Sequence, residues 1–162
     1  MRINVSFDDG GMAKALGELS GIIGDFSPVW PAVDKIVADM ETQQFESEGE
    51  YGGQAWEPLN PTYAARKQRE RGGDGILVAS GRMRRSLIDT RDSEHYFVSG
   101  PNFGEFGTRV PYAMYHQSGT SRGLPKRTVI PVPPGEIGEA IVDAFQAHIW
   151  KRLRGFLTRR GR

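Results

Sequence analysis

The sequence predicts an α+β fold in which an antiparallel β-sheet is flanked by N-terminal helices and a long C-terminal helix. Apolar residues recur at helical spacing towards both ends of the chain, whereas the middle contains short segments in which apolar and polar residues alternate. The 162 residues are enough for one domain with a buried core. We therefore predict a single domain over residues 1–157, followed by a basic and mobile end over residues 158–162.

The first predicted elements are a strand and two helices. Apolar and polar residues alternate over residues 3–7, and the apolar residues between Met12 and Ile23 have helical spacing that glycines weaken. The clearest helix covers residues 28–47, with Ser27 as its N-cap. Its apolar stripe is expected to face the core. Its opposite face is expected to carry Asp34, Lys35, Asp39 and Glu41.

A loop over residues 48–60 leads into a basic helix over residues 61–71. Asn60 suits the N-cap of this helix because its side chain accepts hydrogen bonds from free backbone N–H groups, and Pro61 suits the first turn. A further short segment rich in arginine covers residues 82–87.

The sheet is predicted from four short segments. Residues 86–91, 95–99 and 103–109 have the pattern of antiparallel strands, and residues 128–132 are predicted as a final strand. Pro131 restricts this last strand to an edge because proline has no backbone N–H to donate. The side chains expected to face inwards are Tyr96, Val98, Phe103 and Phe106.

Two helices complete the prediction, a short one over residues 111–117 and a long one over residues 135–157. The end of the chain after Asp143 contains six basic residues and no acidic residue. These bases are Lys151, Arg152, Arg154, Arg159, Arg160 and Arg162.

The composition excludes several classes of protein. The longest stretch without a charged residue has 12 residues, whereas a membrane-spanning helix needs about 20. The absence of cysteine excludes disulfide scaffolds and cysteine-based metal or redox sites. The first residues lack the apolar core of a secretory signal, and we expect the protein to be made in a reducing cytoplasm without membrane attachment.

The net charge of +1 conceals an uneven distribution. Residues 1–57 contain 11 acidic and 3 basic residues, whereas residues 58–162 contain 18 basic and 9 acidic residues. Such a separation suits either contact with nucleic acid or head-to-tail contact between subunits, although uneven surfaces are also common in ordinary proteins.

The residues expected of an enzyme are missing from the sequence. The three histidines, at positions 95, 116 and 148, have no spacing typical of metal ligands, and no nucleophile, phosphate-binding or dinucleotide motif is present. We therefore predict a protein without catalytic activity, cofactor or metal.

Two blocks of sequence combine unusual residue types in a fixed order. The first comprises residues 53–62, which contain Gly-x-x-Trp-x-Pro-Leu, followed by Lys67, Ile76-Leu77 and residues 80–87. The second comprises residues 110–120, which contain Tyr-Ala-x-x-His-Gln-x-Gly, followed by residues 124–127.

The order and spacing of these motifs resemble the phage virion morphogenesis family, whose members include tail completion proteins of the Mu-like type. The resemblance covers about residues 45–130. It implies a structural protein of a tailed bacteriophage that acts late in assembly and makes the tail competent to join the head.

Eight residues are candidates for contacts between subunits. Trp56 is expected to fill a gap either within its own chain or in a neighbouring subunit, and the tyrosines near His116 suit either an interface or a corner of the core. Arg127 is expected to bond a neighbour's carboxylate. The full set is Asp34, Asp39, Trp56, Tyr112, Tyr115, His116, Gln117 and Arg127.

We weigh two functions. The first is a hexameric ring at the neck or tail end of the virion, in contact with connector, adaptor, tail terminator or tail tube proteins and with the C-terminal bases facing DNA in its channel. The alternative is a protein that binds nucleic acid without sequence preference during DNA packaging or head assembly, although no recognition motif accompanies its bases.

Overall fold

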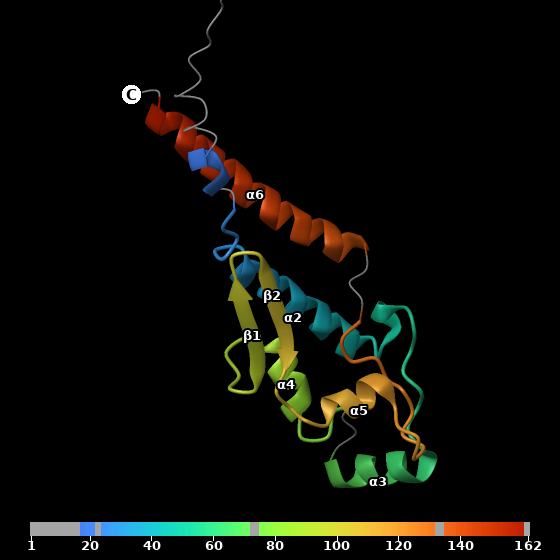
Figure 1. Ribbon diagram of the computed structural model, residues 1–162. Coiled ribbons are helices and arrows are strands. Elements are labelled where there is room, and N and C mark those ends of the chain that lie inside the picture. The colour runs from blue at the N-terminus through green and yellow to red at the C-terminus, as the bar shows by residue number, and fades with distance from the viewer. Residues whose placement is uncertain (1–16, 22–23, 72–74, 132–134, 161–162) are drawn as a thin grey trace, which may run out of the picture.

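The computed structural model describes residues 17–21, 24–71, 75–131 and 135–160. The predicted strand over residues 3–7 and most of the predicted helix between residues 12 and 23 lie outside the described residues, apart from a helical turn at residues 17–21. The described elements give an α+β fold with a long C-terminal helix, as predicted (Figure 1). No helix within these ranges is both long and apolar enough to cross a membrane.

Helix α2 (Trp30–Glu46) lies at the centre of the molecule, between the long helix on one side and the hairpin and α4 on the other (Figure 1). The predicted cap is wrong: Val29 occupies the N-cap position, without a side-chain bond to the helix. Ser27 instead donates its backbone N–H to Asp25 Oδ1 at 2.9 Å, which fixes the turn before the helix. Proline in the first turn supports the helix start because its missing N–H is not needed there.

Helix α6 (Gly135–Arg160) is longer than predicted and runs past the end of α2 (Figure 1). Phe145 joins the two helices, since its ring meets the edges of Trp30 at 5.0 Å and Phe26 at 5.2 Å between centroids. Residues 158–160, predicted as part of a mobile end, continue the helix. Thr158 Oγ1 donates to the Arg154 carbonyl one turn earlier.

The middle of the chain confirms one predicted helix and corrects one strand. Helix α3 (Pro61–Arg71) is capped by Asn60, whose Oδ1 accepts the backbone N–H groups of Thr62 and Tyr63. A short 3₁₀ turn, η1, covers Glu50–Gly52.

Residues 86–91 do not form a strand, because helix α4 covers Arg82–Ile88. Met83 and Leu87 lie one turn apart and both face the core. The spacing of these two buried residues fits one face of a helix and does not fit the two-residue alternation of a strand.

The described sheet is a two-stranded antiparallel hairpin of β1 (His95–Gly100) and β2 (Phe103–Thr108). Phe97 lies opposite Phe106, and the two rings stack at 5.5 Å on the inner face. Phe106 was predicted to face inwards, and this is confirmed by its contact with Trp30.

The other predicted inward residues lie on the opposite face of the hairpin. Val98 and Phe103 are 41% and 50% exposed, and Tyr96 donates its hydroxyl to Glu105 on the same outer face. Successive side chains of a strand point to opposite faces of the sheet. An error of one residue in the predicted alternation therefore places every inward-facing side chain on the outer face.

The predicted strand at residues 128–132 is not present in its described part, residues 128–131. Side chains take the place of a neighbouring strand. The Gln117 side-chain oxygen accepts the N–H groups of Val129 and Ile130, and its nitrogen donates to the Ile130 carbonyl. Gln44 donates to the Thr128 carbonyl at 2.8 Å. These backbone N–H and carbonyl groups therefore form hydrogen bonds with side chains and do not need a neighbouring strand.

The main core lies between α2, α4 and helix α5 (Ala113–Ser118), which confirms the predicted short helix. It consists of Phe45, Trp56, Met83, Leu87, Val110, Ala113 and Val129.

Candidate functional site

A cleft of about 360 Å³ lies between α3 and α5 and is closed by the segments at residues 77–82 and 124–127. We call it the α3–α5 cleft. Members of both sequence blocks line it, although they lie up to 68 positions apart in the chain. These members are Leu59, Asn60, Lys67, Leu77, Ser80, Gly81, Arg82, Met83, Tyr112, His116, Leu124 and Arg127. The fold therefore brings the two blocks together at one place.

Arg127 fixes one wall of the cleft and is only 5% exposed. Its Nε donates to the Glu57 carbonyl at 2.8 Å, and its terminal nitrogen donates to the Pro58 carbonyl at 3.3 Å. Its backbone N–H donates to the His116 carbonyl. The predicted bond from Arg127 to a neighbour's carboxylate stays a prediction. Within the chain, the guanidinium holds the loop at residues 57–58, while the backbone N–H of Arg127 joins the same segment to α5.

Lys67 belongs to the first block, but the sequence alone does not predict that its side chain is buried in the cleft. Lys67 is also 5% exposed, and its Nζ donates to the Gly75 carbonyl at 2.6 Å. Its place in the first motif block is the feature of the sequence that could have indicated a special role. Helical periodicity alone assigns Lys67 to the basic, exposed face of α3.

The cleft is cationic. Lys67, Arg82 and Arg127 line it, and the described lining residues include no carboxylate. Arg82 is paired outwards with Glu94. Burial, with a smaller effect from the Arg127 charge, lowers the pKa of His116, which is therefore neutral at pH 7. Its Nδ1 is buried and has no hydrogen-bond partner. The arrangement suits an anionic or hydrogen-bonding group from another molecule.

A strained backbone position lies in the wall of the cleft. Leu77 has φ of 63°, in the left-handed region that costs a residue with a side chain about 1–2 kcal/mol. Packing of Leu77 against the core stabilises this conformation. The preceding residue, Ile76, donates its N–H to the Glu48 carboxylate at 2.7 Å. The loop is thus held in place from both sides.

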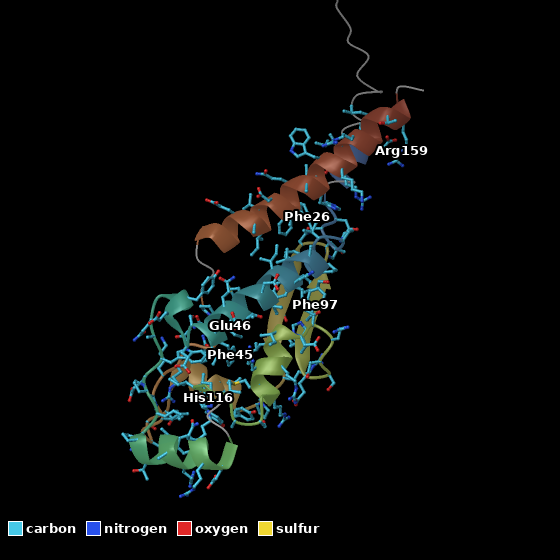
Figure 2. The ribbon with its side chains drawn as sticks, turned by 180° about the vertical axis from the view of Figure 1, so that it is seen from behind. Phe26, Phe45, Glu46, Phe97, His116 and Arg159 are labelled. Atoms are coloured by element: carbon cyan, nitrogen blue, oxygen red, sulfur yellow. The ribbon has the colours of Figure 1, made fainter. Side chains whose placement is uncertain are left out.

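The candidates on α5 separate onto different faces. Tyr112 and His116 meet edge to face at 6.3 Å and line the α3–α5 cleft. Figure 2 labels His116 on this helix. Tyr115 is 51% exposed on the outer face, where it remains available to a partner. Gln117 instead bonds the segment at residues 129–130, as described above.

Trp56 is an anchor within its own chain, the first of the two interpretations. It is buried, its ring meets the edge of Phe45 at 5.3 Å, and its Nε1 donates to the Thr128 carbonyl at 2.8 Å. It does not offer its surface to a neighbouring subunit.

The acidic face predicted for α2 is only partly present. Asp34 is buried, and its Oδ1 lies 3.0 Å from His95 Nε2. His95 Nδ1 lies 2.9 Å from the Ser86 carbonyl, which only accepts, so Nδ1 carries a proton. Within the chain, the Asp34 side chain is therefore engaged with His95 and is not exposed on the surface of α2. Asp39 is exposed, as predicted.

Glu41, also predicted on the polar face, is 1% exposed, and neither of its carboxyl oxygens has a hydrogen-bond partner. Burial raises the pKa of Glu41 to about 8. At pH 7 most molecules therefore carry this side chain in its protonated form.

The C-terminal bases form a second cationic region on α6. Lys151, Arg152 and Arg159 line a hollow of about 330 Å³ together with His148. Arg154 is exposed on the same helix. The side chains of Arg160 and Arg162 lie outside the described residues. Within the described ranges, no group of three or more residues could hold a metal ion.

A comparison with protein families identifies the chain. The model of the phage virion morphogenesis family matches residues 7–143, which include both sequence blocks and the whole α3–α5 cleft. The chain belongs to this family. No curated protein and no solved structure matches it.

The family is one of structural and assembly proteins and is not known for enzymes. The protein therefore has a structural or assembly role in a phage virion. The match ends at residue 143, so the C-terminal bases lie beyond the region shared with the family.

Proposed function

We propose that the protein forms a ring at the tail end or neck of the virion, where it completes the tail and enables the head to join it. The observation that carries this proposal is the convergence of both sequence blocks on one cationic cleft. The cleft offers positive charge from Lys67, Arg82 and Arg127, which suits binding of a partner with complementary charge. In a virion assembly protein, that partner is another virion protein or a second copy of the chain.

The outer surface of α6 supports an assembly role. Val142, Trp150 and Leu157 are all large, apolar and at least half exposed. Their spacing places them within one sector of the helix. Exposed apolar groups of this size mark interaction surfaces, and tryptophan is enriched among residues that dominate binding energy.

The experiment compares infections with a phage that lacks this gene, complemented by the wild-type protein or by variants. We expect filled heads and separate tails without the protein, and joined particles with the wild type. His116→Leu removes the polar wall of the cleft and is expected to reduce joining, whereas Met114→Ala, on the exposed face of α5, serves as the matched control. Joined, infectious particles in the absence of the protein would overturn the proposal.

The second candidate function is binding of DNA without sequence preference. It is favoured by the bases that surround the hollow on α6, which has no carboxylate among its described lining residues. Such binding weakens steeply with salt and does not depend on sequence. A filter or anisotropy assay at 50 and 200 mM salt tests it, and salt-independent or sequence-specific binding would exclude it.

A further inference from the structure

A second cavity, of about 190 Å³, lies between α2, α4 and the hairpin, with Ile130 and Pro131 at its edge. Glu41 and His95 are the titratable groups among its described lining residues. Both ring nitrogens of His95 already have partners, in Ser86 and Asp34. The Glu41 carboxyl is thus the unsatisfied group of this cavity.

Retaining such a carboxyl costs free energy in either protonation state. An ionised carboxylate loses its hydration without gaining a countercharge, and a protonated one leaves its hydrogen-bonding capacity unused. The remaining lining residues are mostly apolar and include Val37, Met40, Leu87 and Phe106. Nothing within the described chain compensates for burying Glu41, which is 1% exposed. A partner from outside the subunit would compensate for it.

We propose that this cavity, the Glu41 cavity, receives the ammonium or guanidinium group of a basic side chain from a second copy of the chain. The inference rests on the proposed ring. A single carboxylate does not provide the several oxygen ligands that a metal cation requires. A lysine or arginine fits better, because its aliphatic stem packs against apolar walls while its charged end meets the carboxylate.

The dimensions agree with this occupant. A volume of 190 Å³ corresponds to about six water molecules at roughly 30 Å³ each, which leaves room for a side chain. Ile130, which also lines the cavity, is 37% exposed, so this wall of the cavity reaches the surface of the subunit.

The end of α6 supplies the complementary charge. Lys151, Arg154 and Arg159 are exposed, and none of them forms an ion pair within the described residues. Figure 2 shows Arg159 near the far end of α6, at a distance from Glu46 and Phe45 on α2. A base of one copy in the cavity of the next, repeated from subunit to subunit, gives a head-to-tail contact of the kind that the proposed ring needs.

The contact has a measurable consequence for pH. Glu41 is mostly protonated in the free subunit at pH 7 and becomes ionised when a cation binds, so association releases protons. Between pH 6 and pH 8 we expect association to strengthen, by at most about tenfold per pH unit for one proton released. His95 is the other titratable group lining the cavity, and it is present in every variant used here.

The first test measures association of the purified protein by analytical ultracentrifugation at pH 6, 7 and 8. Glu41→Gln keeps the shape of the side chain, and Glu41→Met is a second variant that removes a buried polar group and keeps the fold. Gln43→Ala, an exposed and uncharged change on the same helix, is the matched control. We expect both Glu41 variants to fold and to lose the pH dependence and most of the association, while Gln43→Ala behaves as the wild type. Wild-type association in either folded Glu41 variant would overturn the inference.

The second test identifies the occupant in assembled particles. The natural chain has no cysteine, so single substitutions give clean cross-links. Ile130→Cys at the edge of the cavity and Arg154→Cys or Arg159→Cys on α6 are combined in one infection. A disulfide between two copies is expected, and Gln146→Cys, exposed near the middle of α6, is the control position. No cross-link from the end of α6 in particles that contain the ring would overturn the inference.

The two proposals fail in different ways. If particles contain single copies of the wild-type protein, the ring itself is refuted. If a ring is present but forms normally with Glu41→Gln, only the role of the Glu41 cavity is refuted.

Discussion

Replacing Asp34 by alanine is expected to destabilise the protein strongly, whereas the same change at Asp39 is expected to have little effect. Both residues lie on α2, and the sequence alone assigns both to one acidic face. The structure separates them. Asp34 and His95 have side chains that are each 7% exposed and lie 3.0 Å apart, while Asp39 is exposed to solvent.

The expected magnitude follows from this geometry. Removing one member of a buried, hydrogen-bonded pair costs about 3–5 kcal/mol, because the other member remains buried without its partner. Here His95 Nε2 would face a void while Nδ1 stays bonded to Ser86. Since domains are stable by only about 5–15 kcal/mol, Asp34→Ala would remove a large part of that stability. Asp39→Ala is an exposed change and is expected to stay within about 0.5 kcal/mol.

Urea unfolding at pH 7, followed by tryptophan fluorescence, measures both free energies of unfolding. The cycle of Asp34→Ala, His95→Ala and the double variant isolates the coupling between Asp34 and His95, because loss of the bond from His95 to the Ser86 carbonyl occurs equally in His95→Ala and in the double variant. We expect the double variant to lose less stability than the sum of the two single changes. A free energy for Asp34→Ala within about 0.5 kcal/mol of that for Asp39→Ala would refute the assignment of Asp34 to the interior.

Four further predictions follow from the same contacts. Trp56→Phe should cost about 1–2 kcal/mol in urea unfolding, because it loses the indole N–H and some ring volume while the accepting carbonyl keeps a second donor; no loss would contradict the anchor. The wild type should lose stability as pH rises from about 4.5 to about 8, because folded Glu41 keeps a proton that the unfolded chain releases, and unfolding of Glu41→Met at pH 5, 6.5 and 8 should lack this slope. Deleting residues 158–162 should change the melting temperature by less than about 2 °C but lower the yield of joined particles, and full infectivity would show that this end is dispensable. Asp39→Lys with Glu46→Lys should leave stability unchanged and reduce joining in complemented infections; normal particles would exclude an assembly role for this face.

The sequence predicts those elements whose signals are local. The cap and proline at Asn60-Pro61 place the start of α3, and the apolar stripe places α2 to within a few residues. The hairpin is placed correctly because its two strands are adjacent in the chain and pair with each other.

Elements that depend on distant partners are not predicted. The segment at residues 128–131 has strand-like composition, but Gln117 and Gln44 occupy its hydrogen-bonding groups and no strand lies beside it among the described residues. The inner face of the hairpin is decided by the contact of Phe106 with Trp30, which alternation within the strand does not specify.

The candidate site is predicted in its residues but not in its geometry. The motif blocks identify Tyr112, His116 and Arg127, all of which line the α3–α5 cleft. An analysis of periodicity assigns charged residues to the surface. It cannot reveal that the side chains of Lys67 and Arg127 are buried and donate hydrogen bonds to backbone carbonyls. The partners that make burial possible lie far away in the chain, 70 positions in the case of Arg127 and Glu57.

The folded structure also changes what the uneven charge of the sequence means. Asp34 and Glu41 are inside the molecule, so part of the acidic first third never reaches the surface. The exposed acids that remain include Glu46, which Figure 2 shows near the middle of the molecule, far from Arg159 towards the end of α6. A two-fold symmetric contact, with each patch meeting its own copy, would oppose like charges. Pairing exposed acids such as Glu46 of one subunit with the basic end of the next suits a head-to-tail arrangement, which closes into a ring when its rotation allows.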